Sequence, residues 1–374
     1  MKPHIYISVT NDLVTDQRVD RTAGLLSSAG AVVCLIGRIL PGSPDTGIRS
    51  YRTKRLRLLV KKGPAFYAAY NTRLFFYLVS RRRISHIVSN DLDTLAACFF
   101  ASRLRGATLV YDSHEYFTEV PELQGRRFVK SVWTVLEKCI VPRLKFAYTV
   151  NDSIARILQT KYGVHFHVVR NVPSLRHESL PYSLPDEARG KKIVIYQGAV
   201  NIGRGIEEVI DAVKPLDDVV FVIAGTGDII AGIRSRIKRD HLEHKVILTG
   251  RIKPANLHSL TSQAHLGVSC ELNMGLNYFY ALPNKLFSYI HAGIPVLTSA
   301  FPEMEHIVKT YSVGMTVDDP ANTARLTELL KTMLYDEARI SAWKSNTLIA
   351  ARELCWEKEQ IKLKNIYSKA GLPF

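Results

Sequence analysis

The chain has 374 residues, of which 47% are hydrophobic and 22% charged, a composition typical of a globular protein with two domains. Its apolar runs stay below the roughly 18 residues that a membrane span needs, and the segment before Ile5 is too short for a signal peptide. The five cysteines are scattered, which favours reduced thiols in the cytoplasm over a disulfide framework or a zinc site.

The net charge of +16 is concentrated in the first half of the chain. Residues 1–180 carry 27 Lys and Arg against 13 Asp and Glu, a net charge of +14, and the remaining residues carry +2. We therefore expect the first half to meet an anionic partner.

The first half alternates expected strands and helices, which is typical of a parallel, doubly wound sheet. The expected strands cover residues 4–9, 31–36, 86–89, 108–111 and 148–150. The expected helices cover residues 16–28, 64–83, 91–104 and 126–144, and another begins at Ser153. Residues 38–50 are expected to form a loop, and a basic stretch follows before Pro64.

Two of these helices, 64–83 and 126–144, combine aromatic residues with Lys and Arg at or near their ends. The stripe of Phe66, Tyr70 and Leu74 suits packing on a sheet. The other aromatics and the cations suit an anionic bilayer surface. Both interpretations stay open: core helices with solvated ends, or a membrane-facing surface.

The sequence Asp91-Leu92-Asp93 is a D-x-D pattern, which can hold a divalent metal ion. The two acids stand where a helix is expected to begin, so a capping role is the favoured interpretation. We predict no metal site.

Residues 174–190 lack periodicity and are expected to form an interdomain linker. The alternation then resumes. Strands are expected at 192–197, 219–224, 246–249, 266–269 and from Val296. Helices are expected at 204–213, 257–263, 283–292, 321–334, 337–353 and from about Trp356.

The helix that starts at Pro283 predicts a phosphate site. Pro283 suits a first helical turn, and Gly293 suits the end of the helix. The free amides of the first turn, the positive end of the helix dipole and Lys285 would together attract a phosphate group.

The pattern PNKLF-x-Y-x-x-AG-x-PV at residues 283–296 resembles the donor-site segment of retaining glycosyltransferases of family 4, the group 1 glycosyltransferases. The resemblance implies the α/β GT-B fold, in which two Rossmann-like domains face each other across a cleft and a C-terminal helix crosses back to the first domain. The implied domains are 1–173 on the acceptor side, a linker at 174–190, a nucleotide-sugar domain at 191–355 and the crossing helix at 356–374.

Three further segments resemble motifs of the same family: YDSHE at 111–115, the glycine-rich loop at 197–205 and the turn at 225–228. The resemblance implies catalytic roles for His114, Arg204 and Lys285. It implies donor contacts from Gly198, Gly205, Gly225, Thr226, Arg251, Ile252, Glu271, Asn284 and Ser288. On the acceptor side we expect Asn11, Asp12 and Glu115. A purely structural role for His114 is the alternative.

The sequence departs from the family pattern in two places. The basic residue that usually follows the first glycine is replaced by Ala199, so one phosphate contact is expected to be missing. The usual pair of acids falls at Tyr280 and Ser288. Glu271 is a candidate to replace one of these acids.

The implied reaction moves a sugar from a nucleotide-diphosphate sugar to a hydroxyl of a glycan or lipid-linked glycan, with retention. No metal and no cofactor besides the donor is expected, because Arg204, Lys285 and helix amides would stabilise the leaving diphosphate. We expect a cytoplasmic protein, peripheral on the inner membrane face. The alternatives are a nucleotide-sugar epimerase or hydrolase of the same fold, and a catalytically weakened sugar-binding member. No nucleic-acid motif is present, so no nucleic-acid partner is expected.

Overall fold

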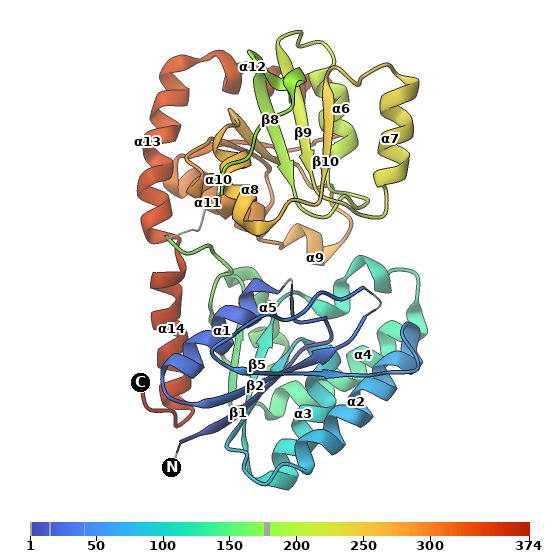
Figure 1. The fold of residues 1–374 in the computed structure, drawn as a ribbon, viewed down its shortest axis with the longest axis vertical. Coiled ribbons are helices and arrows are strands. Elements are labelled where there is room, and N and C mark those ends of the chain that lie inside the picture. Colours follow the sequence, from blue (N-terminus) through green and yellow to red (C-terminus); the bar gives the residue numbers. More distant parts are fainter. Residues whose placement is uncertain (1, 15, 41, 176–179) are drawn as a thin grey trace. The chain divides into compact units, whose positions relative to one another are not determined.

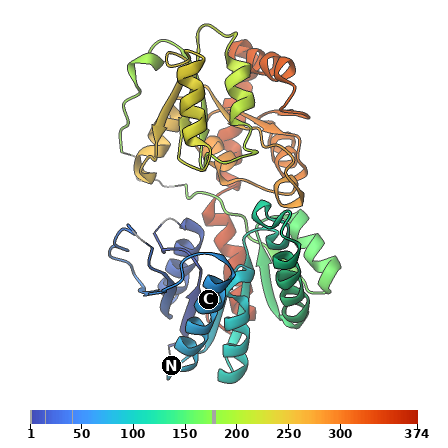
Figure 2. The ribbon, with the colours of Figure 1, turned by 90° about the vertical axis from the view of Figure 1, so that its right-hand side faces the viewer.

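The computed structural model describes residues 2–14, 16–40, 42–175 and 180–374 (Figure 1). The chain divides into two compact units, residues 1–171 with 360–374 (unit 1) and residues 172–359 (unit 2). Each unit contains one parallel sheet with helices on both faces (Figure 2). The two Rossmann-like α/β domains expected from the sequence are confirmed.

The sheet of unit 1 has seven strands in the order β3-β2-β1-β4-β5-β6-β7. They are β1 (His4–Ser8), β2 (Val32–Arg38), β3 (Arg52–Leu56), β4 (His86–Asn90), β5 (Thr108–Ser113), β6 (Phe146–Thr149) and β7 (Phe166–Val168). Every neighbouring pair is parallel, so all the carboxyl ends meet at one edge of the sheet.

The helices of unit 1 connect these strands. They are α1 (Gln17–Ser28), α2 (Gly63–Val79), α3 (Leu92–Arg105), α4 (Arg127–Ile140) and α5 (Asp152–Tyr162), joined by the end of α14 (Trp356–Lys369). The buried face of α2 consists of Phe66, Tyr70, Leu74 and Leu78, whose spacing of four residues forms one helical stripe. This part of α2 packs on the sheet, and only its outer face remains for other contacts.

The C-terminal helix returns to unit 1. The rings of Tyr148 and Tyr367 lie with centroids 6.4 Å apart. Nε2 of His86 lies 2.9 Å from the carbonyl oxygen of Ala370, just beyond the end of α14. These contacts fix the end of the chain on the unit 1 sheet.

The sheet of unit 2 has six strands in the order β10-β9-β8-β11-β12-β13. They are β8 (Lys192–Gln197), β9 (Val219–Ala224), β10 (Val246–Gly250), β11 (Leu266–Ser269), β12 (Val296–Ser299) and β13 (Gly314–Val317). The helices are α6 (Ile206–Val213), α7 (Ile230–Arg239), α8 (Pro254–Ser262), α9 (Leu276–Phe279), α10 (Asn284–His291), α11 (Pro302–Tyr311), α12 (Thr323–Tyr335) and α13 (Glu337–Glu353).

Alternate residues of the central strand β8 enter two different hydrophobic layers. Val194 and Tyr196 belong to one layer, and Ile193 and Ile195 belong to the other. Successive side chains of a strand point to opposite faces, so both faces of this sheet are covered. Its strands therefore read as continuous apolar runs in the sequence.

Several elements differ from the sequence prediction. The basic stretch before Pro64 contains an edge strand, β3, in which Arg52 and Lys54 are exposed and Leu56 is buried. Exposed cations on an edge strand discourage pairing with the edge of another sheet. A strand of this kind has no continuous run of apolar residues, so its sequence does not indicate a strand. The elements α7, α11 and β13 are also absent from the prediction. Pro283 precedes α10 with ψ of 137° instead of forming its first turn.

The predicted linker at 174–190 is associated with unit 2. Its residues 176–179 lie outside the described part of the chain. The backbone nitrogen of Leu180 donates to the carbonyl oxygen of Ala255 at 2.7 Å, and Ala188 is buried against the unit 2 core. The unit boundary falls between residues 171 and 172, two residues before the predicted end of the first domain.

In the described ranges, no helix combines the length and apolarity required to cross a bilayer.

Candidate active site

The strand order of unit 2 reverses between β8 and β11, which pair with each other. In open α/β sheets, ligands bind beyond the carboxyl ends of the strands at such a switch point. The loop after β8 carries Arg204, and Glu271 lies two residues beyond the end of β11. The topology therefore places these two predicted residues where a ligand is favoured.

Glu271 holds two predicted cations side by side. Its Oε1 lies 2.8 Å from Nζ of Lys285 and 3.8 Å from Nη1 of Arg204. Its Oε2 accepts a hydrogen bond from Oγ of Ser269 at 2.8 Å. The carboxylate is fully buried, whereas 24% of the Arg204 side chain is exposed. The cluster carries one more positive than negative charge, which suits an anionic ligand.

The ion pair keeps both of its buried members charged. Burial alone would raise the pKa of Glu271, but Lys285 outweighs this effect and holds the pKa below its ordinary value. Burial alone would lower the pKa of Lys285, but Glu271 outweighs it and raises the pKa. Lys285 is therefore a fixed positive charge at neutral pH.

Two tyrosine rings support these cations. Nζ of Lys285 lies 4.0 Å from the ring centroid of Tyr196, and Cζ of Arg204 lies 4.5 Å from that of Tyr278. The sequence analysis missed both tyrosines. The position of Tyr196, directly before Gln197 at the end of a buried strand, was the only available signal for it.

Two glycine-rich turns are tied together beside this cluster. The backbone nitrogen of Gly198 donates to the carbonyl oxygen of Ala224 at 3.0 Å. A Cβ atom on Gly225 would lie 1.8 Å from the carbonyl oxygen of Gly198. Gly205 has φ of +72°, and a Cβ atom there would lie 1.8 Å from the carbonyl oxygen of Cys270. Close backbone approach therefore explains Gly225 and Gly205 and places Arg204 next to Glu271, whereas Gly198 is required by its φ of +131°.

Two more predicted donor residues belong to α10. Asn284 is its first residue and is exposed. The backbone nitrogen of Leu286 donates to the carbonyl oxygen of Pro283 at 3.1 Å, so helix geometry leaves the amides of Asn284 and Lys285 without intrahelical acceptors. Oγ of Ser288 donates to the carbonyl oxygen of Asn284 at 3.2 Å. The serine is therefore bonded within its own helix.

The structure does not bring every predicted donor residue to the cluster. Arg251 is exposed beyond β10, and Ile252 packs against the hydrophobic layer beneath α10. Thr226 is exposed, and its carbonyl oxygen accepts from the backbone nitrogen of Val200 at 3.1 Å. A direct ligand contact of these three residues stays a prediction.

Glu271 requires a correction. It was expected to replace an acid that takes sugar hydroxyls, but it is buried and both of its carboxylate oxygens are bonded within the protein. Its structural role is to position Lys285 and Arg204.

The strand order of unit 1 reverses between β1 and β4, and the carboxyl edge near this point carries His114. Its Nε2 lies 3.1 Å from Oδ2 of Asp112 and 3.2 Å from Oδ1 of Asn90. Its Nδ1 lies 3.3 Å from Oδ2 of Asp91, and its backbone nitrogen donates to Oδ1 of Asp91 at 2.7 Å. Both ring nitrogens are thus engaged within unit 1.

The buried Asp112 links His114 to an arginine. Nη2 of Arg18 donates to Oδ1 of Asp112 at 2.7 Å. Burial alone would raise the pKa of Asp112, but Arg18 and His114 outweigh it and lower the pKa to about 2. Burial alone would lower the pKa of His114, but Asp91 and Asp112 raise it to about 10. Asp112 therefore favours the imidazolium form of His114, whereas burial raises the pKa of Asp91 to about 8 and weakens the contribution of this partner near neutral pH.

Asp91 occupies the N-cap position of α3, as the sequence predicts, but the capping role of its side chain is wrong. Asp91 has φ of +58° and makes no side-chain cap bond to α3, because its two carboxylate oxygens face His114. Asp93 also turns away from the helix end, and its Oδ2 accepts from Oγ1 of Thr10 at 2.6 Å. The two acids organise the carboxyl edge of the sheet.

The three acceptor-side candidates lie in loops at the same edge. Oδ1 of Asn11 accepts from the backbone nitrogen of Leu13 at 2.9 Å, and Oδ1 of Asp12 accepts from that of Val14 at 3.1 Å. The carbonyl oxygen of Glu115 accepts from the backbone nitrogen of Phe117 at 2.9 Å. These bonds shape the loops, and acceptor contacts stay a prediction.

Across the described ranges, no three or more His, Cys, Asp or Glu side chains are grouped so that they could hold a metal ion.

Residues 185–348, which lie in unit 2, match the family model of the glycosyl transferases group 1. Among curated proteins, none matches the sequence. The family match covers less than half of the chain, and the described fold matches that of solved GT-B glycosyltransferase structures.

Three solved structures illustrate the fold. Sucrose-phosphate synthase from Thermosynechococcus elongatus matches with a TM-score of 0.80 at 17% identity, over 98% of this chain and 99% of that one. Anabaena Alr3699/HepE in complex with UDP-glucose matches with a TM-score of 0.75 at 13% identity, over 98% of this chain and 99% of that one. WaaG, a glycosyltransferase involved in lipopolysaccharide biosynthesis, matches with a TM-score of 0.66 at 14% identity, over 96% of this chain and 99% of that one.

Proposed function

We propose, from the match of residues 185–348 to the group 1 glycosyltransferases, that the protein moves a sugar from a nucleotide-diphosphate sugar to an acceptor hydroxyl. The observation that carries this proposal is the cluster of Arg204, Glu271 and Lys285 at the switch point of unit 2. Four of the similar solved structures contain UDP or UDP-glucose, so a UDP-sugar is the first donor to test.

The cluster suits the diphosphate of such a donor. When the bond between the sugar and the diphosphate breaks, negative charge develops on the leaving diphosphate. Lys285, Arg204 and the amides at the start of α10 supply fixed positive charge and hydrogen-bond donors. Glu271 keeps the two cations in place before the ligand binds, so little reorganisation accompanies the reaction.

These groups provide the electrostatic stabilisation that a bound metal would otherwise supply, so we propose transfer without a metal. For the stereochemistry we propose retention at the anomeric carbon. In this reaction the acceptor hydroxyl forms the new bond to that carbon, the bond to the diphosphate breaks on the same face, and the proton of the hydroxyl passes to the leaving phosphate. No side chain has to act as the general base, in agreement with the protonated state of His114.

The departures from the family pattern predict a weaker donor site. Ser288 offers a neutral oxygen where a carboxylate would bind sugar hydroxyls, and charge-assisted hydrogen bonds are roughly twice as strong as neutral ones. Ala199 offers no phosphate contact. We therefore expect modest donor affinity.

For unit 1 we propose that the acceptor, a glycan or lipid-linked glycan, binds at the carboxyl edge of the sheet. There the partly buried His114 lies between Asp91 and Asp112. These carboxylates compensate the charge of the imidazolium, which would fix the loop that carries Glu115.

We also propose that the outer face of α4 meets an anionic membrane surface. Trp133, Glu137 and Ile140 are buried beneath this helix. Its other face exposes Phe128, Val132 and Val135, with 82%, 51% and 60% of their surfaces accessible.

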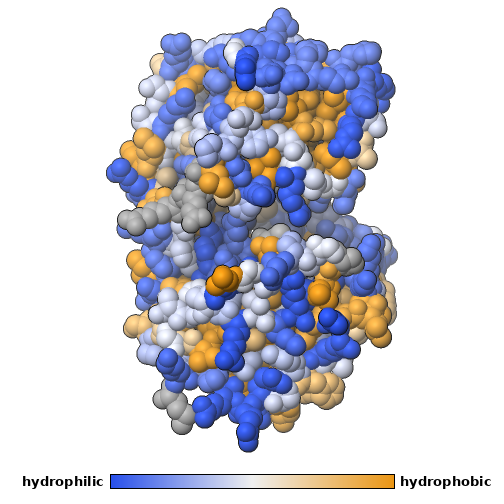
Figure 3. Space-filling model, in the orientation of Figure 1, coloured by the Kyte–Doolittle hydropathy of each residue, from blue (hydrophilic) through white to orange (hydrophobic). Residues whose placement is uncertain are grey.

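The charge around α4 complements anionic lipids. Residues 124–145 contain six Lys and Arg but a single acid, Glu137, which is buried and pairs with Lys161. On the face of the protein that Figure 3 shows, hydrophobic atoms are exposed between hydrophilic ones. Exposed apolar side chains among cations are typical of surfaces that lie on anionic bilayers. This arrangement supports a peripheral protein on the cytoplasmic face.

A thermal-shift panel of nucleotide diphosphates and their sugars tests the donor proposal. We expect UDP or a UDP-sugar to raise the melting temperature of the wild type and of Lys331→Ala, an exposed cation on α12, but to shift Arg204→Ala much less. If no nucleotide shifts the wild type, or if both variants respond equally, the proposed site is wrong.

An epimerase or hydrolase of the same fold is the second candidate. It would consume the nucleotide sugar rapidly without any acceptor, whereas a transferase needs an acceptor hydroxyl. Following the donor by chromatography with and without added glycan acceptors separates the two reactions.

A further inference from the structure

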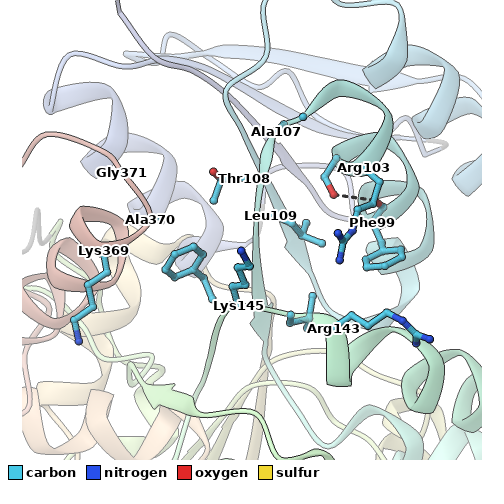
Figure 4. Close-up of a pocket in the computed structure, with 14 residues that line it drawn as sticks. Phe99, Arg103, Ala107, Thr108, Leu109, Arg143, Lys145, Lys369, Ala370 and Gly371 are labelled. Atoms are coloured by element: carbon cyan, nitrogen blue, oxygen red, sulfur yellow. Dashed lines mark hydrogen bonds between the residues drawn. The ribbon is translucent and has the colours of Figure 1, made fainter.

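Unit 1 contains a pocket of about 520 Å3 at the amino ends of β5 and β6 (Figure 4). Thr108 and Phe146, the first residues of these strands, both line it. His114 follows the opposite end of β5, so the pocket lies at the other edge of the sheet from the site described above. No step of the proposed sugar transfer uses it.

Four cations line this pocket: Arg103, Arg143, Lys145 and Lys369. No Asp or Glu is among the residues that line it. Within the part of the chain that the structure describes, none of these four side chains forms an ion pair. Figure 4 shows Arg103 and Lys145 on either side of Leu109, while Arg143 and Lys369 extend from the rim.

The cations come from separate elements that the fold brings together. Arg103 belongs to the last turn of α3, Lys145 precedes β6, and Lys369 ends α14. A cation in the last turn of a helix complements the helix dipole, which accounts for Arg103 and Lys369. The dipole does not explain Lys145, nor the gathering of all four cations in one pocket, because like charges repel each other unless an anion lies between them.

The walls of the pocket are fixed by backbone contacts. Gly106 ends α3 with φ of +63°, and the backbone nitrogen of Ala107 donates to the carbonyl oxygen of Ser102 at 3.0 Å. The carbonyl oxygen of Ala370 lies 2.9 Å from Nε2 of His86, which holds the segment with Lys369 against the sheet. The pocket is therefore formed before any ligand arrives.

The pocket also offers apolar contacts. The guanidinium of Arg103 lies 5.3 Å from the ring centroid of Phe99, and Leu109 and Phe146 add apolar surface. The neighbouring Phe100 and Leu104 are exposed on the outer face of α3. A ligand with an anionic group and an apolar part fits this combination.

We propose that this pocket binds a phosphate-bearing group, at a site separate from the nucleotide site of unit 2. Lys and Arg without competing acids recognise phosphate through charge-assisted hydrogen bonds. The group can belong to the headgroup of an anionic lipid or to a free phosphorylated compound. Both sources share the chemistry that Arg103 and Lys145 recognise.

Two probes and three variants of the full chain test this site at low ionic strength. Inorganic pyrophosphate, followed by calorimetry, represents the free source. Phosphatidylcholine vesicles with and without phosphatidic acid, followed by flotation, represent the lipid source. The pocket variant is Arg103→Ala with Lys145→Ala, and the conservative variant is Arg103→Lys with Lys145→Arg.

The charge-matched control is Lys54→Ala with Lys61→Ala. Both of these residues are exposed in unit 1, and Lys54 belongs to β3 at the far edge of the sheet. This control loses the same charge but leaves the pocket intact.

We expect the pocket variant to lose about tenfold or more in affinity for at least one probe, while the control and conservative variants retain it. If the pocket variant loses affinity for pyrophosphate, the ligand is a free phosphorylated compound. If it loses affinity only for vesicles with phosphatidic acid, the ligand is a lipid headgroup. Equal binding of both probes by the pocket and control variants overturns the proposal, as does a wild type that binds neither probe. UDP binding measured in parallel should be unchanged in the pocket variant, so a failure of the nucleotide site is recognised separately.

Discussion

Nζ of Lys285 lies 2.8 Å from Oε1 of Glu271, and both side chains are buried in unit 2. Removing one partner of a buried ion pair leaves the other charge uncompensated, which costs about 3–5 kcal/mol. We expect Glu271→Gln to lower the free energy of unfolding of unit 2 by about 3 kcal/mol. Urea unfolding measures this change, with Glu243→Gln at an exposed position as the control. Equal midpoints for the two variants would show that the pair is not structural.

Arg204 is the more accessible cation of the cluster, so its loss should affect binding more than folding. We expect Arg204→Ala to weaken UDP binding by about 1–3 kcal/mol, because one charge-assisted contact to the diphosphate is lost. Titration calorimetry measures the affinity. An affinity equal to that of Lys331→Ala would remove Arg204 from the donor site.

Gly205 must remain glycine for two reasons: its φ is +72°, and a Cβ atom would lie 1.8 Å from the carbonyl oxygen of Cys270. We expect Gly205→Ala to destabilise unit 2 by at least about 1–3 kcal/mol, the usual cost of strained backbone. It should also weaken UDP binding, because Arg204 is adjacent. Thermal unfolding and calorimetry test both effects.

Gly232→Ala is the matched control for this substitution. Gly232 lies within α7, and no atom lies within 4 Å of a Cβ added there. Alanine favours helices by roughly 0.5–1 kcal/mol over glycine, so this variant should be slightly more stable than the wild type. A stable, fully binding Gly205→Ala variant would contradict the close backbone approach.

The charge of His114 predicts a pH dependence of stability. Its pKa is raised from 6.5 to about 10 in the folded protein. The contribution of its charge to the free energy of unfolding is therefore complete below pH 6.5 and is lost as the pH rises toward 10. We expect His114→Gln to be less stable than the wild type at pH 6 and to differ from it less at pH 10.

Urea unfolding of the wild type and of His114→Gln between pH 6 and pH 10 gives the difference in their free energies of unfolding, which is the contribution of His114. An unchanged difference between pH 6 and pH 10 would mean that the imidazole is not held as a cation.

The exposed face of α4 predicts membrane association. We expect Phe128→Ser with Val132→Ser to reduce flotation of the protein with vesicles of phosphatidylglycerol at low salt, because less apolar surface enters the bilayer interface. Higher salt should weaken binding of the wild type, since cations flank the helix. Leu348→Ser with Ile349→Ser removes two similarly exposed apolar residues from α13 and serves as the control. Equal flotation of the two variants would exclude the α4 face.

The sequence analysis was accurate where the signal is local. The strands β8, β9 and β11 have the predicted bounds, because both faces of the sheet are covered and their residues form unbroken apolar runs. β3 was missed because an edge strand with exposed cations carries no such run. The motif at 283–296 placed Lys285 at the start of a helix, but Glu271 and Tyr196, which hold it, come from other strands and share no local pattern with it.

The order of apolar runs, turn glycines and charges along this chain determined its two parallel sheets and the helix that starts beside Lys285, because each of these depends on residues near one another in sequence. Only the tertiary structure decided which charges meet: Glu271 with Lys285 and Arg204, Asp91 with His114, and the cations that line the pocket at the amino ends of β5 and β6. The order of the strands in each sheet determines which charged residues come into contact. The free energy of a charged side chain depends on its partners and its burial, and a sequence pattern specifies neither.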